Sequence, residues 1–513
     1  MFFPIGQETR FRLPVEEDEE VVHVAGSRER GLIAVLTPTS IHVYNAQPSV
    51  PLCSIRRPES EIAEKGEFVR AYWQFDGAAI AVSTKHCHLL IFSVHFDTAE
   101  RSYGIGDTDN DAELSRPSRL RITRDGLPSV SMTLTIVVNL AAPVTSAVPL
   151  RENLFISGRN GFSHHLYWDG KVDNGYSFQL SKIPFAHDQL QSKSAFLPAD
   201  SQIYVRDCAY APLCGGFVLV LSDGRAALLT SNDPKFHPNS LLGVWAGQVR
   251  DAVATDTNHR FRILIFGCAN GDVCAYNLDE ATGALVQTFR VPLRIRNGPE
   301  LTNRLGAVRE VRVLPQNGAI AVVWETANGG GKRQNGIDGE KSSPSSSSTS
   351  TLPLPPCAAL FSPLGNQLWS SLEGHDDDHN NTVASYSTTI TDETVKKGER
   401  RSPSYRSIEW GPEGYQIWMG GSHGLSKLDV ARSAAFNNPY MEHSERVVLI
   451  GSQRLYISPL RTREPEASAP HSVWTTVELR TDYIHANWPI RWEDFLGWKA
   501  EGNIDRADFV FFK

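Results

Sequence analysis

One short pattern recurs along the chain and constrains its fold more than any other feature: an apolar run, a short polar turn and a second apolar run. In ILIFGCANGDVCAYN, which starts at Ile263, the turn is Asn270-Gly271. The other clear copies start at Gly31, Ala78, Asn153, Gly216, Gly318 and Gly414, and RVVLIGSQRLYIS at Arg446 is a candidate for one more. Recurrence at this scale indicates a repeat architecture rather than an isolated hairpin.

Each copy has the composition of two antiparallel strands. The first run is apolar on both sides, as expected of a strand enclosed between neighbouring sheets. The second run is richer in aromatic and β-branched residues, which are typical of strands. In three copies the turn is Asn160-Gly161, Asp223-Gly224 or Asn270-Gly271. These pairs predict tight hairpins with positive φ at both central positions.

Further strands complete the repeated unit. FVRAYW at Phe68, VREVRVL at Val308 and YRSIEW at Tyr405 each precede a hairpin, and ALVQTFRV follows one after Gly283. Four antiparallel strands repeated in this way describe the blades of a β-propeller, whose closed ring leaves few exposed sheet edges. We therefore predict an all-β, WD-repeat-like β-propeller of about seven, or eight, four-stranded blades over residues 1–480.

The spacing between copies is irregular, and the excess lies in polar insertions. Residues 327–353 are low in complexity, and residues 100–125 and 373–402 are polar and lack periodicity. Such segments cannot bury enough apolar surface to fold, so we expect long disordered loop insertions. Residues 481–513 are expected to begin a following segment.

Composition excludes several classes of function. The formal net charge is −8, and no Lys/Arg run is longer than two, so nucleic acid is not an expected partner. The N-terminus lacks the pattern of a signal peptide. The uncharged residues 126–150 contain three prolines and strand-like clusters, so we do not expect them to span a membrane. The seven scattered cysteines favour buried thiols in a reducing compartment.

Several local motifs resemble catalytic or metal sites, but their expected geometry does not support such sites. HDDDH at residues 375–379 lies in an acidic insertion, where consecutive residues rarely present preformed ligands. His86-Cys87-His88 and His164-His165 lie in or beside hairpins, where neighbouring side chains point to opposite faces. GIDGEKS at residues 336–342 departs from a phosphate-binding loop. We predict no catalytic, cofactor-binding or metal-ligating residues, and no cofactor.

Cysteines and tryptophans are expected mainly in the core. Cys208 and Cys214, like Cys268 and Cys274, are spaced too widely for a zinc knuckle or redox motif. The tryptophans are read as packing residues, with a docking surface as the alternative. They are Trp245, Trp410, Trp418, Trp474, Trp488, Trp492 and Trp498.

Several stretches resemble one known family. They are Leu241 to Leu285, FVRAYWQFDGAAIAVST at Phe68, RSIEWGPEGYQIW at Arg406 and DYIHANWPIRW at Asp482. They are similar to the larger, propeller-bearing subunit of the Ric-one/Rgp-one guanine-nucleotide exchange complex for the Golgi GTPase Rab-six.

The resemblance implies a cytosolic protein that is peripheral on Golgi membranes. Together with an arrestin-like partner subunit it would promote GDP release from a Rab-family small GTPase in endosome-to-Golgi retrograde vesicle transport. Exchange involves no bond chemistry and works through differential affinity for the states of the GTPase. No family motif identifies the residues that touch the GTPase or the partner subunit.

The end of the chain departs from the family. Members continue into a second propeller and a helical solenoid, whereas the residues after Arg491 do not follow the next blade, so a truncated form or an alternative end is expected. Two other functions stay open. One is a non-catalytic propeller scaffold of another vesicle coat or tethering assembly. The other, a propeller hydrolase, is least favoured because no convergent acid, base or nucleophile motif is present.

Overall fold

The computed structural model describes residues 2–96 (except 12, 14–18 and 47–48), 129–326 (with short gaps), 354–372, 404–435 (except 413 and 415), 445–450, 454–459 and 475–478. The short gaps are residues 191–192, 199–201, 232–236, 248, 259–260, 295–299, 302–304 and 316–317. The predicted insertions and the segment 481–513 lie wholly or almost wholly outside the described residues. The chain divides into two compact units, which are described in turn.

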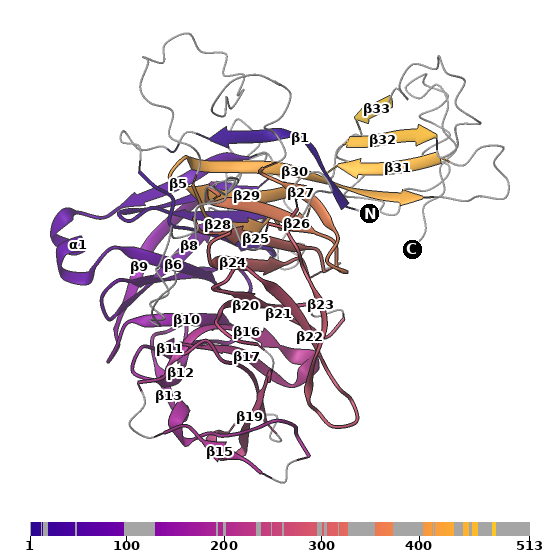
Figure 1. The fold of residues 1–513 in the computed structure, drawn as a ribbon. Helices are drawn as coiled ribbons and strands as arrows, with labels where there is room; N and C mark the ends of the chain where they lie inside the picture. Colours follow the sequence, from indigo (N-terminus) through magenta and orange to yellow (C-terminus); the bar gives the residue numbers. More distant parts are fainter. Residues whose placement is uncertain are drawn as a thin grey trace, which may run out of the picture. The chain divides into compact units, whose positions relative to one another are not determined.

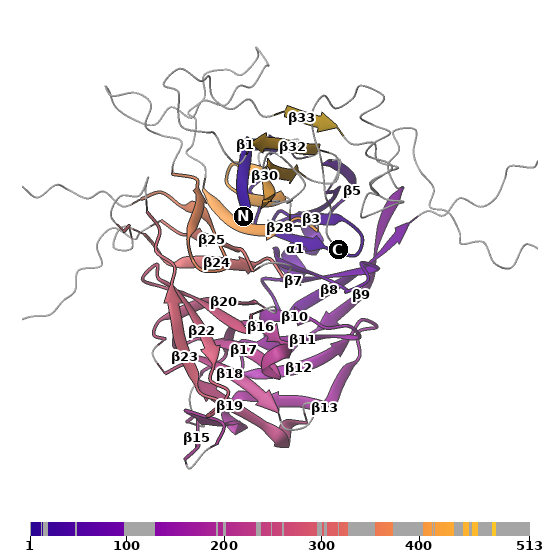
Figure 2. The same cartoon turned by 90° about the vertical axis from the view of Figure 1, so that its right-hand side faces the viewer.

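The larger unit, Arg10–Pro412 with Trp418–Leu425, contains the repeated sheets (Figures 1 and 2). Blade 1 consists of β2 (His23–Ser27), β3 (Leu32–Leu36), β4 (Ser40–Asn45) and β5 (Val50–Arg56). Blade 2 consists of β6 (Phe68–Trp73), β7 (Ala79–Thr84), β8 (His88–Phe96) and β9 (Val130–Asn139). Blade 3 consists of β10 (Val144–Pro149), β11 (Asn153–Gly158), β12 (Phe162–Tyr167) and β13 (Val172–Gln179).

The next blades follow the same meander. Blade 4 consists of β16 (Val205–Ala211), β17 (Gly216–Leu221), β18 (Ala226–Ser231) and β19 (Leu241–Trp245), with β14 (Pro184–Ala186) and β15 (Ala195–Phe196) added at its outer edge. Blade 5 consists of β20 (Ala252–Asn258), β21 (Ile263–Cys268), β22 (Val273–Leu278) and β23 (Leu285–Arg290). Blade 6 consists of β24 (Val308–Val313), β25 (Ile320–Trp324), β26 (Cys357–Phe361) and β27 (Gln367–Ser370).

Blade 7 starts with β28 (Tyr405–Trp410) and β29 (Gln416–Gly421), and β30 (Gly424–Ala435) follows. The helices in the described residues are short: α1 (Glu59–Lys65), which links blades 1 and 2, and the 3-10 turns η1 (Leu180–Lys182), η2 (Pro212–Cys214) and η3 (Pro238–Ser240). None of them is long and apolar enough to cross a membrane. The apolar stretch at residues 126–150 contributes β9 and β10 instead.

The first strand of each blade lies innermost, and these strands contact one another in a closed circle. The order is β2, β6, β10, β16, β20, β24, β28 and back to β2, and β10, β16, β20 and β24 follow one another in both views (Figures 1 and 2). The ring therefore has seven blades, and the predicted β-propeller is confirmed. Since seven strands close the circle, the candidate eighth copy is not a blade of the ring.

The second strand of each complete blade forms the core of the ring. Every residue of β3, β7, β17, β21 and β25 is buried, and β11 is buried except at its two half-buried ends. These are the runs that the sequence predicted to be apolar on both sides. Burial on both faces follows because each sheet packs between two neighbouring blades.

The tight turns differ from the prediction. Their glycines have positive φ, at Gly161 (78°), Gly224 (84°) and Gly271 (88°). The Asn or Asp before each glycine is not among the described residues with positive φ. The Gly271 N–H donates to the Cys268 carbonyl at 3.1 Å, and the other two copies make the equivalent bond. The loops are therefore type I turns followed by a left-handed glycine, a geometry in which only the glycine needs positive φ.

The smaller unit comprises Met1–Thr9, Glu413–Ile417 and Ser426–Lys513. Within it, β30 is followed in meander order by β31 (Glu445–Ile450), β32 (Arg454–Pro459) and β33 (Thr475–Glu478). The hairpin predicted at Arg446 is thus present as β31 and β32. Strand β1 (Phe2–Phe11) pairs with β30.

Candidate functional site

Six of the seven innermost strands of the ring carry a polar side chain at one recurring position, and we call the seven residues at this position the inner belt. In β6, β10, β16, β20 and β24 this position directly follows a bulge in the pairing with the second strand. Its members are His23, Arg70, Ser146, Asp207, Ala254, Glu310 and Ser407. An innermost strand is a sheet edge, so its N–H groups on the channel side need partners from outside the sheet.

The inner belt supplies these partners from the neighbouring blade. Five belt side chains each accept a hydrogen bond from a backbone N–H of the next innermost strand around the ring. The bonds are Val24 N–H to Ser407 Oγ (3.0 Å), Ala71 N–H to His23 Nδ1 (3.3 Å), Cys208 N–H to Ser146 Oγ (2.9 Å), Thr255 N–H to Asp207 Oδ2 (3.0 Å) and Ile408 N–H to Glu310 Oε2 (2.9 Å). In every case the donor is the residue after the next strand's own belt position.

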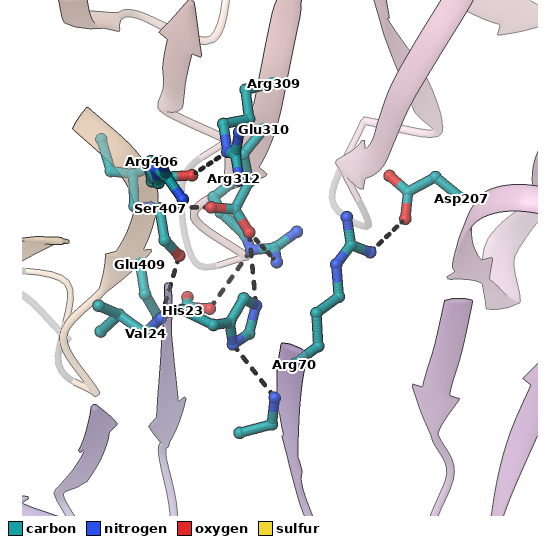
Figure 3. Close-up of polar contacts among 12 residues, drawn as sticks. His23, Val24, Arg70, Asp207, Arg309, Glu310, Arg312, Arg406, Ser407 and Glu409 are labelled. Carbon is teal, nitrogen blue, oxygen red and sulfur yellow. Dashed lines mark hydrogen bonds and ion pairs between the residues drawn. The ribbon is translucent and has the colours of Figure 1, made fainter. Parts of the chain in front are cut away.

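Two belt members cannot accept such a bond. Ala254 has no polar atom in its side chain, and Arg70 is only a donor. Arg70 Nη1 instead lies 3.1 Å from Asp207 Oδ1, two blades further on. The pair meets in front of Ser146, whose hydroxyl lies 3.4 Å from the same Asp207 oxygen. The small serine of the intervening blade leaves room for this contact (Figure 3 shows Arg70 and Asp207).

A second charged cluster joins blades 1, 6 and 7 (Figure 3). Arg312 Nη2 pairs with Glu310 Oε1, and Arg312 Nε lies 3.4 Å from Glu409 Oε2. Glu310 is almost fully buried. Burial alone would raise its pKa, but Arg312 and His23 hold the pKa well below its ordinary value. Glu310 is therefore ionised and engaged on several sides.

Two titratable groups of this cluster are shifted toward their neutral forms. Burial lowers the pKa of His23 below its ordinary value, although the nearby Glu310 carboxylate acts in the opposite direction. Burial raises the pKa of Glu409 to about 7, while Arg312 and Arg28 oppose the rise. Burial thus brings the pKa of one channel-lining carboxyl group, Glu409, close to neutral pH, although Arg312 lies beside it.

Tryptophans support the packing interpretation where the structure describes them. Trp410 and Trp418 are buried, and Trp410 Nε1–H donates to the Arg312 carbonyl of the preceding blade at 3.1 Å. Trp73 makes the equivalent bond to Ala25 at 3.0 Å. Trp245 stacks on a phenylalanine ring at 4.4 Å. The positions 474, 488, 492 and 498 lie outside the described residues.

The other motifs considered from sequence do not converge on a metal site within the described residues. His164 Nδ1 lies 3.0 Å from a serine hydroxyl, while the ring of His165 packs on Phe155. All seven cysteines are free thiols. Of the spaced pairs, Cys268 and Cys274 lie close enough for their thiols to interact, and Cys274 alone is only half-buried. Within the described segments, no group of three His, Cys, Asp or Glu side chains could share a metal ion. HDDDH at 375–379 and GIDGEKS at 336–342 lie outside those segments.

The inner belt was not identified from the sequence, although a signal was present. FVRAYW, VREVRVL and YRSIEW align with Arg70, Glu310 and Ser407 at the third position. A polar residue in an otherwise apolar, buried strand indicates that its side chain faces neither the solvent nor the apolar core. Their partners lie in other blades, so spacing along the chain does not reveal them.

Comparison with known proteins finds relatives over nearly the whole chain. No family model matches. The chain is 38% identical over 497 residues to the guanine nucleotide exchange factor subunit R06F6.8 of Caenorhabditis elegans, which aligns with 96% of this chain and 31% of that protein. It is 25% identical over 551 residues to the guanine nucleotide exchange factor subunit RIC1 of Mus musculus, and 24% identical to that of Homo sapiens. Each RIC1 alignment covers 97% of this chain and 36% of the relative.

The chain thus spans about a third of the length of these relatives. Among solved structures, the β-propeller domain of Cps50 (Swd1) from Myceliophteria thermophila aligns with 83% of this chain and 99% of that domain. The identity is 9% and the TM-score 0.47.

Proposed function

The chain is a RIC1-like homologue of guanine nucleotide exchange factor subunits, and we propose that it acts as the propeller-bearing subunit of an exchange complex for a Rab-family GTPase. The observation that carries the proposal is the 38% identity to an exchange factor subunit, maintained over 96% of this chain. Similarity of that extent runs through all seven blades rather than one repeat.

The chemistry of the ring supports a binding role. In the described residues, the charged groups of the inner belt engage one another or backbone N–H groups. Buried polar networks of this kind hold the surrounding structure in one arrangement, which suits a structural role for the inner belt. A rigid ring that presents loops is suited to holding partners in a fixed orientation.

We propose the following mechanism and setting. The subunit binds an arrestin-like partner, and the complex stabilises the nucleotide-free GTPase relative to the GDP-bound form, so that GDP is released. The target is Rab-six, and the complex works on Golgi membranes as a peripheral cytosolic assembly in endosome-to-Golgi retrograde transport. Residues 1–480 form the propeller-bearing region, and residues 481–513 begin a further segment.

The test is reconstitution of the complex. The full chain would be co-expressed with the arrestin-like subunit, and release of mant-GDP from Rab-six would be followed by fluorescence. Release faster than with either subunit alone is the expected result. A complex that forms and binds the GTPase but leaves GDP release unchanged would instead support a scaffold in a vesicle coat or tethering assembly.

A further inference from the structure

The channel inside the ring widens into a cavity of about 670 Å³. Its lining follows the innermost strands and continues into the loops after β2, β6 and β10. Three residues of these loops line the cavity and are exposed to solvent, so the cavity opens at this end. We call Arg28, Phe75 and Arg151 the cavity mouth.

The charged groups deeper in the cavity are already engaged with protein partners. Arg70 pairs with Asp207, and Arg312 pairs with Glu409. Asp256 accepts a hydrogen bond from the Val313 N–H at 2.6 Å. These groups have little left to offer a charged ligand.

The two arginines of the cavity mouth differ from the deeper charges. Across the described part of the chain, neither Arg28 nor Arg151 has an ion pair within 4 Å. Arg28 lies farther than 4 Å from Glu409, but its charge still lowers the pKa of Glu409. Among the described residues, the mouth therefore carries two positive charges outside any ion pair, and an approaching group would find five guanidinium donors on each.

The cavity mouth also contains an apolar side chain. Phe75 is 62% exposed, and the half-buried Leu150 and Tyr210 also line the cavity. Exposed aromatic side chains next to arginine are the composition found at the centres of protein interfaces. The aromatic ring also sits at a concave surface, where an inserted side chain would be desolvated on several sides.

We propose that the cavity mouth binds an acidic segment of a protein partner, with its carboxylates on Arg28 and Arg151 and an apolar side chain against Phe75. Charge complementarity selects an acidic ligand, since the mouth carries the unpaired positive charges. Concavity selects a peptide over an anionic bilayer, because a flat lipid surface cannot reach into the cavity. The inference goes beyond the proposed exchange function and does not depend on it, since it concerns recognition of a segment by the ring itself.

The test is a direct binding measurement on the full chain. The probe is a fluorescein-labelled peptide of about twelve residues that repeats Glu-Glu-Phe, followed by fluorescence anisotropy. We expect saturable binding that weakens as salt rises. The double variant Arg28→Glu, Arg151→Glu should weaken it by at least about tenfold, and Phe75→Ala should weaken it by severalfold.

The matched control is the double variant Arg206→Glu, Arg250→Glu. Both arginines are exposed and lie toward the opposite ends of innermost strands, at the start of β16 and before β20. This control changes the net charge by the same amount as the double variant of the cavity mouth. Because it leaves the mouth intact, it should bind the peptide like the unmodified chain. All variants alter exposed side chains, and an unchanged melting temperature would confirm that each is folded.

Three results would overturn the inference. The first is no binding of the peptide by the unmodified chain. The second is an equal loss in both double variants, which would indicate a general effect of charge. The third is that phosphatidylserine-containing vesicles bind through Arg28 and Arg151 while the peptide does not, which would assign the mouth to a membrane surface.

Discussion

His23 Nε2 of blade 1 lies 3.6 Å from Glu310 Oε1 of blade 6, so this contact passes over blade 7. The intervening belt residue is Ser407, whose small side chain leaves the space open. Because His23 Nδ1 accepts from the Ala71 N–H, the proton of the neutral ring is on Nε2, which faces the carboxylate. One histidine thus links the first blade to the second and to the sixth.

The carboxylate of Glu310 is expected to be critical for stability. Glu310→Ala would remove one of the two carboxylates that pair with Arg312 and the acceptor of the buried Ile408 N–H, at a cost of about 3–5 kcal/mol in the free energy of unfolding. Urea denaturation measures the change. Glu325→Ala is the control, because it removes an exposed partner of Arg309 and should cost under about 1 kcal/mol. Equal losses would refute a special role for the inner belt.

Ser407→Ala is expected to weaken the closure of the ring. The Val24 N–H is buried and loses its acceptor, at a cost of about 1–3 kcal/mol. Hydrogen exchange should show faster exchange at Val24 while amides in blade 4 keep their protection. Uniformly faster exchange would mean that the bond does not act locally at the closure.

Acid is expected to destabilise the ring through buried histidine. Burial lowers the pKa of His42 from 6.5 to about 4, so the unfolded chain binds a proton there more readily than the folded chain. Its stabilising contribution is present above pH 6.5 and is lost as the pH falls toward 4. In His42→Gln the free energy of unfolding should fall less steeply over this interval, by up to about 1.4 kcal/mol per pH unit. An unchanged slope would contradict this assignment.

Glu409 is expected to have the opposite effect on the pH dependence of stability. Burial raises its pKa from 4.5 to about 7, so its stabilising contribution is present below pH 4.5 and is lost as the pH rises through 7. Glu409→Gln keeps a side chain of similar shape without the charge. We expect it to raise the free energy of unfolding by roughly 1–3 kcal/mol at pH 8 and to change it much less at pH 5. A loss at pH 8 would show that the ion pair with Arg312 outweighs burial.

The glycine that opens β17 is expected to tolerate no side chain. A Cβ at Gly216 would lie 1.8 Å from the Leu229 carbonyl oxygen, which belongs to the neighbouring strand and cannot move independently. Gly216→Ala should therefore destabilise by about 3 kcal/mol or more in thermal unfolding. Gly247→Ala is the control, because nothing lies within 4 Å of its Cβ position, and it should be nearly neutral.

The fold could be predicted from sequence because its information is local. Hairpins such as β21 and β22 carry their own hydrophobic pattern and turn residues, and the ring follows from their repetition. The prediction of positive φ at Asn270 was wrong, because an added turn residue shifts that requirement onto Gly271 alone.

The inner belt could not be predicted in the same way. Arg70 and Asp207 are 137 residues apart in sequence, and their contact depends on the small side chain of Ser146 between them. A hairpin pattern says nothing about which blades will face one another across a channel. The number of blades could not be predicted from a single repeat either, because it depends on how many blades close the circle.

The hydrogen bond from the Val24 N–H to Ser407 Oγ can form only late in the synthesis of the chain. Its two residues are separated by 383 positions, so the inward edge of the earliest blade leaves the ribosome long before its last neighbour exists. At ordinary translation speeds that wait is roughly 20–80 s. A nascent chain with an uncapped strand for so long is a natural client for chaperones, and slowing elongation between blades 6 and 7 would lengthen that dependence.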